Sequence, residues 1–304
     1  MREVEKESNR KFFKDNRTGK RMLRAAFLVL FALGFLYYEN NALEVSDFNV
    51  ESLNIPAEFE GYKILQISDL QSKSFGRGQE KLIECIRSQE PDIIVLTGDL
   101  VDYKDKELES TKIFLEGIRE ISPIYFITGN HEEASEYSAI LMELLEEYGI
   151  IVLDGESIIL KRGEGEILLS GISDLKQFYG QYSRPGATFR ETLQALSGDG
   201  EIGKKEGTYR ILLSHRPELI DNYAEAKFDL VFSGHAHGGQ VRLPFIGGLI
   251  APGQGFFPKY TEGIYVTNKT SMVVSRGLGS SSIPQRLFNH PEIVVVTLSV
   301  ANHK

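Results

Sequence analysis

The stretch DIIVLTGDLVD, residues 92–102, decides how this chain folds. Four consecutive apolar residues, 93–96, predict a short buried strand, and Gly98 and Asp99 follow closely behind it. A strand that is apolar on both faces is typical of a parallel sheet covered by helices. The carboxyl ends of such strands line a crevice, so we expect Asp99 to face a binding site.

Four other apolar runs end in polar side chains that can bind a cation. These are Asp69 after KILQIS, Asn130 and His131 after PIYFITG, His215 after YRILLS, and His235 and His237 after DLVFSG. One such residue alone would more often be a turn or a hydrogen-bonded structural side chain. The repetition in order along the chain, with four of the six histidines in these segments, favours convergence on one site.

Segments with helical spacing separate the predicted strands. Residues 79–89, 106–120 and 134–149 have this pattern, and strands that alternate with helices predict an α/β fold with a largely parallel sheet. The second half is richer in strands, with tight turns expected at residues 154–155 and 162–163. The chain shows no repeat of solenoid period and no low-complexity linker, so one domain is expected.

The composition is that of a globular protein. The chain has 304 residues, 41% of them hydrophobic, which suffices for a core without disulfides. Its one cysteine, Cys85, is expected on the inner face of a helix. Residues 1–24 carry nine Lys/Arg and four Asp/Glu, whereas the remainder carries 25 and 39. This acidic body argues against a nucleic-acid partner, and in particular against a nuclease.

The N-terminal segment is typical of a membrane anchor. Residues 25–38 are uncharged, and Met22 and Leu23 extend the run to a length just sufficient to cross a bilayer. The basic flank predicts a cytoplasmic N-terminus with the body on the other side. A cleaved signal peptide is the alternative, although no small-residue cleavage site follows Tyr38. We expect a single-pass anchor at 22–38 after a basic segment 1–21.

The predicted cluster suits a metal centre. Carboxylate, amide oxygen and imidazole together favour first-row divalent cations such as Mn, Fe or Zn, with Mg as a further option. A carboxylate can bridge two cations, and paired cations about 3.5–4 Å apart catalyse phosphoester hydrolysis.

The ordered motifs GDLVD, GNHE, LLSHRPE and GHAHGGQ resemble the calcineurin-like metallophosphoesterases over about residues 60–240. The later segments, such as IAPGQGFFPKYTEGIY, look like the membrane-associated bacterial branch of that family. The resemblance implies a four-layer fold, with two packed mixed β-sheets flanked by helices. It also implies a metallophosphoesterase domain over residues 56–304, after a membrane-proximal segment with the first strand at 39–55.

The resemblance also implies a role for each residue of the cluster. It makes the chain a hydrolase with two divalent cations, in which a bridging hydroxide attacks phosphorus. His131 would stand near the leaving group as the catalytic histidine. The implied metal ligands are Asp69 and His237 for the first cation, Asn130, His215 and His235 for the second, and Asp99 for both.

The expected substrate is a phosphorylated small molecule or a lipid-like phosphoester at the membrane or cell envelope. Monoester, diester and pyrophosphate substrates all stay open, because the motifs specify the metal centre and not the leaving group.

The first motif departs from the family pattern. The family has Asp-x-His where this chain has Asp69, Leu70 and Gln71. Gln71 could bind the first cation through its amide oxygen, which would favour Mn or Mg over Zn. Alternatively the first position is loosely held, or the protein is a non-catalytic phospho-ligand-binding protein with a degenerate first site. We favour the first of these three interpretations.

Several further residues have two interpretations. Glu132 could orient His131 or satisfy a helix N-terminus. Arg276 and Arg286 could bind phosphate or be structural. The aromatic residues Phe256, Phe257 and Tyr260 could line a lipid or aromatic substrate pocket, or could be packing residues.

Overall fold

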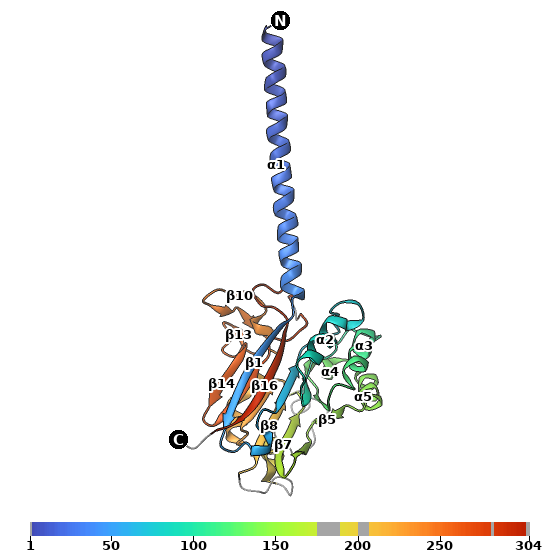
Figure 1. Ribbon diagram of the computed structural model, residues 1–304, viewed down its shortest axis with the longest axis vertical. Helices are drawn as coiled ribbons and strands as arrows, with labels where there is room; N and C mark the ends of the chain where they lie inside the picture. The colour runs from blue at the N-terminus through green and yellow to red at the C-terminus, as the bar shows by residue number, and fades with distance from the viewer. Residues whose placement is uncertain (1, 175–188, 200–206, 281–282, 302–304) are drawn as a thin grey trace.

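The computed structural model describes residues 2–174, 189–199, 207–280 and 283–301, with their side chains from residue 19 onward. A long N-terminal helix projects from one end of an α/β body (Figure 1).

The helices are short apart from the first. They are α1 (Arg2–Asn41), α2 (Glu80–Ser88), α3 (Glu109–Ile118), α4 (Asn130–Ala134), α5 (Ser138–Glu147), α7 (Phe189–Gln194) and α8 (Ile220–Glu225). The strands of the first half are β1 (Glu44–Ser52), β2 (Lys63–Ile67), β3 (Ile93–Thr97), β4 (Ile124–Ile127), β5 (Ile151–Val152), β6 (Ser157–Arg162) and β7 (Gly165–Ile172). Those of the second half are β8 (Tyr209–Ser214), β9 (Leu230–Ser233), β10 (Arg242–Leu243), β11 (Gly247–Gly248), β12 (Ile250–Ala251), β13 (Gly255–Phe256), β14 (Gly263–Thr267), β15 (Thr270–Val274) and β16 (Glu292–Val300).

Strands β1 to β9 and β14 to β16 form two six-stranded sheets. The first has the order β1-β16-β2-β3-β4-β5, and the second has the order β14-β15-β9-β8-β7-β6. Each has a parallel centre, with antiparallel pairing between β16 and β2 in one sheet, and at β6 and β14 in the other. The resemblance therefore gave the correct prediction of two mixed sheets, whereas the strand pattern alone indicated one largely parallel sheet.

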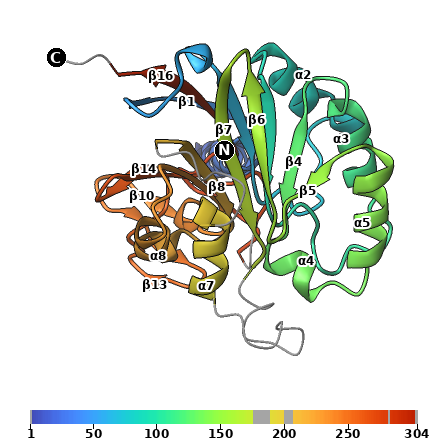
Figure 2. The ribbon, with the colours of Figure 1, turned by 90° about the horizontal axis from the view of Figure 1, so that it is seen from below.

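Side-chain alternation along the strands builds four layers. In β3, Ile93 and Val95 pack between the two sheets, whereas Ile94 and Leu96 pack against α2, α3 and α5. In β8, Leu212 points instead toward the core under α7 and α8. Successive residues of a strand point to opposite faces, so strands that are apolar throughout are buried on both. Figure 2 shows the two helix groups on opposite sides of the body.

Cys85 lies on α2, where it is partly buried against the core beneath the helices. This agrees with the expectation of a small apolar packing residue.

Helix α1 contains an apolar segment, Gly19–Asn41, of mean hydropathy 1.5 that is 6% buried. By length and composition this segment is able to span a bilayer. It is the one segment of this kind among the described residues. The structure thus contains the predicted apolar helix.

The direction of the strands places the carboxyl ends of β2, β3 and β4 near α1. Strand β1 starts just after α1 and runs away from it, β16 is parallel to β1, and β2 is antiparallel to β16. Strands β2, β3 and β4 are mutually parallel, so their carboxyl ends point back toward the base of α1. The residues that follow these strands therefore lie at the α1 end of the body.

Candidate metal centre

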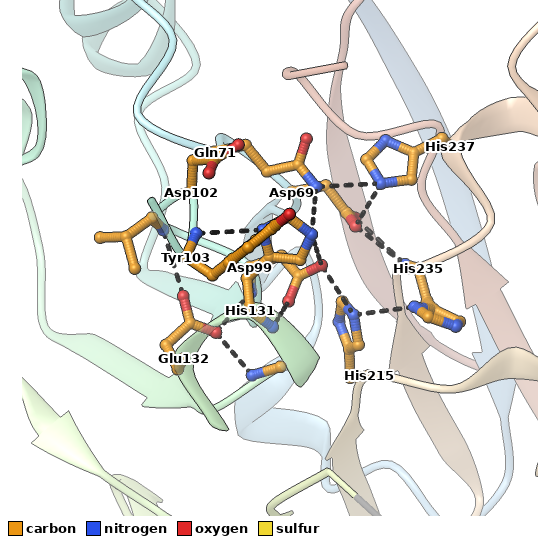
Figure 3. Close-up of polar contacts among 12 residues, drawn as sticks. Asp69, Gln71, Asp99, Asp102, Tyr103, His131, Glu132, His215, His235 and His237 are labelled. Atoms are coloured by element: carbon orange, nitrogen blue, oxygen red, sulfur yellow. Dashed lines mark hydrogen bonds and ion pairs between the residues drawn. The ribbon is translucent and has the colours of Figure 1, made fainter. Parts of the chain in front are cut away.

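The loops after five strands bring the predicted residues together. Figure 3 shows Asp69, Asp99 and His131, which follow strands of the first sheet, facing the histidines after β8 and β9. The described cluster contains Asp69, Gln71, Asp99, His131, His215, His235 and His237, most of them buried. No single motif could have predicted that these residues lie together, because they come from the ends of strands in both sheets.

Asp99 belongs to two sets of side chains whose ligand atoms lie close enough together to hold a cation. One set is Asp99, His215 and His235, and the other is Asp69, Asp99 and His237, with ligand atoms in each set lying within 4.8 Å of one another. Two positions that share one carboxylate are the arrangement that a bridging ligand produces.

Hydrogen bonds to the backbone orient these side chains. The Nδ1 atom of His215 lies 2.8 Å from the Thr97 carbonyl oxygen, and a hydrogen bond donated there turns Nε2 toward Asp99 and His235, at 3.4 and 3.2 Å. The Asp99 Oδ1 atom accepts a 2.8 Å hydrogen bond from the His131 N–H. Asp69 accepts from the His235 N–H and, at 2.6 Å, from the Ser68 hydroxyl.

The backbone at the cluster is strained. Asp69, Gln71, Asp99, His235 and His237 have φ angles of 51°, 49°, 53°, 64° and 47°. This left-handed conformation costs a non-glycine residue roughly 1–3 kcal/mol and is concentrated at functional sites. It is expected here because each loop must turn sharply to aim its side chain back at the cluster.

Two glycines allow the loops after β3 and β4 to touch. A Cβ atom on Gly129 would lie 2.3 Å from Asp99 Oδ1, and one on Gly98 would lie 2.7 Å from the Gly129 nitrogen. Gly98 also has a φ of 90°. Any side chain at either position would push Asp99 away from the cluster.

The electrostatics of the cluster suit cation binding. Burial lowers the pKa of His237 to about 4, and burial together with nearby His215 lowers the pKa of His235. Both imidazoles are therefore neutral, as ligands must be. Burial opposes charge on Asp99 and His215, but their mutual attraction outweighs it, so the pKa of Asp99 is lowered and that of His215 raised. A cation would compete with the His215 proton.

Unpartnered oxygens also fit a cation. Asn130 Oδ1 and Gln71 Oε1 are buried and have no hydrogen-bond partner in the part of the chain that the structure describes. The Gln71 Nε2 atom lies 3.4 Å from His131 Nε2 and 3.3 Å from His237 Nε2. Rotating the amide by half a turn exchanges its oxygen and nitrogen and points the oxygen into the cluster.

His131 lies at the rim. Its Nε2 atom is 3.9 Å from Asp99 Oδ2 and its side chain is 16% exposed. The ring stands edge-on to Tyr103, with 5.3 Å between ring centroids. An imidazole here can reach a group bound at the centre while remaining accessible to solvent.

Glu132 is buried and fastens the Asp99 loop. Its carboxylate accepts hydrogen bonds from the backbone N–H groups of Gly129, Asp99 and Val101, at 2.7, 2.8 and 3.1 Å. Burial, with a contribution from Asp99, raises the pKa of Glu132 to about 7. The contacts favour the helix N-terminal interpretation over orientation of His131, because the carboxylate binds backbone.

Sequence reasoning missed one charged pair. Arg216 binds Asp174 through two hydrogen bonds of 2.7 and 2.9 Å, and its Nη1 atom lies 3.4 Å from His235 Nε2. Asp174 follows the apolar run of β7, so the strand-end pattern could have identified it.

Two arginines considered for phosphate binding have structural partners. Arg286 is buried and donates to the carbonyl oxygens of Gly279 and Arg276. The Arg276 guanidinium pairs with Glu44 and Glu292, each at 3.1 Å. The structure therefore favours the structural interpretation for both.

Comparison with known proteins gives one family. The family model for calcineurin-like phosphoesterases matches residues 62–239. This range begins just before β2 and ends just after His237, so it contains the whole cluster.

Related proteins match over most of the chain. The uncharacterized metallophosphoesterase YkuE of Bacillus subtilis (strain 168) is 31% identical over 272 residues, which cover 88% of this chain and 89% of the relative. The uncharacterized metallophosphoesterase YkoQ of the same organism is 27% identical, covering 90% and 97%. A transmembrane protein with metallophosphoesterase domain from Danio rerio is 28% identical, covering 90% of this chain and 62% of its own length.

Proposed function

Because the chain belongs to the calcineurin-like phosphoesterase family, we propose that it hydrolyses a phosphoester at a centre of two divalent cations. The observation that carries this proposal is the pair of cation-binding sets that share Asp99. A single set would be sufficient for a structural ion, whereas two sets joined by one carboxylate fit a hydrolytic centre.

In this proposal each residue of the cluster has one role. Asp69, Gln71 and His237 would hold the first cation, Asn130, His215 and His235 would hold the second, and Asp99 would bind both. Cations in these positions supply a nucleophilic water and positive charge opposite the phosphoryl oxygens. The chain itself contributes His131, placed at the rim to donate a proton to the leaving oxygen or stabilise its charge.

The residues around the centre position its ligand side chains. Glu132 and the Thr97 carbonyl fix the Asp99 loop and the His215 ring. The ion pair of Arg216 with Asp174 lies beside His235, and the Arg216 Nη1 atom is 3.4 Å from His235 Nε2. Gln71 gives the first position an oxygen ligand, which favours Mn or Mg there.

We place this activity at a membrane. Helix α1 has an apolar segment long enough to span a bilayer, and its flank is basic. We infer one crossing over residues 22–38, with 1–21 in the cytoplasm, 39–55 at the membrane surface and the catalytic domain 56–304 outside. Protease digestion of intact cells tests this orientation, since an extracytoplasmic body would be cleaved and a cytoplasmic one protected.

The test of the activity uses the full chain in detergent. After metal removal, p-nitrophenyl phosphate and bis-p-nitrophenyl phosphate are assayed with Mn, Fe, Zn and Mg in turn. We expect metal-dependent turnover that Asp99→Ala abolishes and Asp102→Ala largely keeps, because Asp102 binds the Lys104 N–H of its own loop. Equal turnover in wild type and Asp99→Ala would overturn the proposal.

A phospho-ligand-binding protein without catalysis is the second candidate. The presence of Gln71 where the family has an imidazole favours it, because the first position then has one strong ligand fewer. Binding of inorganic phosphate without turnover in any of the four metals would support this candidate over the hydrolase.

A further inference from the structure

Two hairpins leave large apolar side chains without cover. Phe245 and Ile246 form the tip between β10 and β11, and Phe256 and Phe257 end the hairpin of β12 and β13. Phe245 is fully exposed, and Phe256 and Phe257 are 78% and 70% exposed. Neighbouring exposed aromatic side chains of this kind mark an interaction surface. The four residues are named here the hairpin tips.

The hairpin tips are joined to the base of α1. The Arg242 backbone N–H of β10 donates to the Leu287 carbonyl oxygen at 3.0 Å. On the other side of Leu287, the Arg286 N–H donates to the Asn40 side chain at 2.7 Å. The Phe257 N–H donates to Leu249, which attaches the second hairpin to the first. Figure 1 shows β10 and β13 at the end of the body from which α1 leaves.

The base of α1 is held to the body by side chains. Glu39 is buried and accepts hydrogen bonds from the Phe288 N–H and from His290. The Lys73 ammonium donates to the Asn40 carbonyl oxygen. The ring of Phe35 lies 6.0 Å from that of Phe288. These contacts fix the direction of the helix relative to the hairpin tips.

The metal centre lies at the same end. The carboxyl ends of β2, β3 and β4 point toward the base of α1. Asn289 connects the two regions, since its side-chain amide donates to the carbonyl oxygens of His237 and Gln240 at 2.8 Å. A bilayer crossed by α1 would therefore face both the metal centre and the hairpin tips.

We propose that the hairpin tips insert into the surface of the bilayer that α1 crosses, and hold the metal centre against lipid-borne phosphoesters. This inference deepens the proposed function and rests on it for the substrate. Aromatic side chains are favoured at the membrane interface, and such contacts are strengthened by a second attachment of the same protein. The acidic body makes apolar insertion, rather than charge attraction, the basis of the contact.

The contact is measured with the full chain in phosphatidylcholine vesicles. The chain has no tryptophan, so Phe245→Trp introduces a single reporter that brominated lipids quench on contact. Leu28→Trp in α1 is the positive control for insertion. Leu53→Trp is the matched exposed control, because Leu53 follows β1, roughly 30 Å along that strand from α1.

We expect brominated lipids to quench Phe245→Trp and Leu28→Trp and to leave Leu53→Trp unchanged. Quenching of Leu28→Trp without quenching of Phe245→Trp would overturn the membrane contact. A further outcome is that brominated lipids do not quench Phe245→Trp but its emission shifts to shorter wavelength as the protein concentration rises. The hairpin tips would then contact a second copy of the chain instead of the membrane.

The substrate is tested separately with Phe245→Ser combined with Ile246→Ser. We expect the apparent KM for phosphatidic acid in vesicles to rise on the order of tenfold, and turnover of soluble p-nitrophenyl phosphate to stay unchanged. Turnover of the soluble ester without the lipid ester would overturn the substrate class. Quenching of Phe245→Trp without turnover of either ester would support the membrane contact and contradict the proposed hydrolase activity.

Discussion

At the residue scale, we propose that Gln71 sets how tightly the first cation is held. Its side chain lies between His131 and His237, where an imidazole would supply a stronger ligand to a first-row cation. We predict that Gln71→His raises the metal retained after dialysis, measured as ions per chain by elemental analysis, and shifts preference toward Zn.

The control for this substitution is Gln89→His, which adds an imidazole at the end of α2, far from the cluster. Unchanged metal content and unchanged activity in Gln71→His would show that Gln71 does not bind the cation.

Asp154 gives the protein a pH dependence of stability. Burial raises the pKa of its carboxyl to about 6, against the opposing hydrogen bond from the Thr128 N–H. The folded state thus holds the proton more tightly than the unfolded state, so stability falls as pH rises from about 4 to about 6. We predict that Asp154→Asn is more stable than wild type at about pH 7, by up to about 3 kcal/mol, and equal at about pH 4.

Thermal melts at the two pH values measure this difference, with the exposed Asp47→Asn as control. If Asp154→Asn changed the stability by the same amount at both pH values, Asp154 would not titrate in this range.

The cluster residues were predictable because each one follows an apolar run. Asp69, Asp99 and the histidines all obey this rule, and Asp174 does too. The roles of Arg286 and Glu132 were not predictable, because their partners are backbone groups whose positions depend on the fold.

At the element scale, Glu132 at the start of α4 holds the loop after β3. Removing its carboxylate leaves three backbone N–H groups without their partner. We predict that Glu132→Ala lowers the free energy of unfolding by roughly 3 kcal/mol and reduces turnover, because Asp99 loses its fixed position. Chemical denaturation measures the first effect, and a melt indistinguishable from that of the exposed control Glu136→Ala would contradict it.

The attachment of α1 also depends on few side chains. Asn40 accepts from the Arg286 N–H and donates to the Pro284 carbonyl at 3.2 Å. We predict that Asn40→Ala speeds hydrogen exchange in residues 284–290. Asn41→Ala is the control, because among the described residues the Asn41 side chain donates to the Tyr37 carbonyl of its own helix. Equal exchange in both variants would show that Asn40 does not fasten α1.

Most elements of the body were predictable from periodicity, and the hairpins β10 to β13 were not. Residues 242–257 are rich in glycine and proline and have no clear period, so their pairing depends on the neighbouring backbone. Hairpins this short are stabilised by contact with the body rather than by their own sequence.

At the scale of the whole molecule, the candidate metal centre is built from residues of both sheets, and neither sheet alone supplies the full set. Asp69 and Asp99 follow strands of the first sheet, and His215 and His235 follow strands of the second. The pairing of β16 between β1 and β2 joins the two ends of the chain. Such long-range pairing cannot be deduced from local pattern, and it directs the centre toward α1.

A two-cation centre is tested most directly by anomalous diffraction from crystals of the full chain grown with Mn. We predict two anomalous peaks about 3.5–4 Å apart, both within bonding distance of Asp99, with His237 beside one and His215 and His235 beside the other. One peak that does not touch Asp99, or peaks only outside this cluster, would contradict a two-cation centre bridged by Asp99.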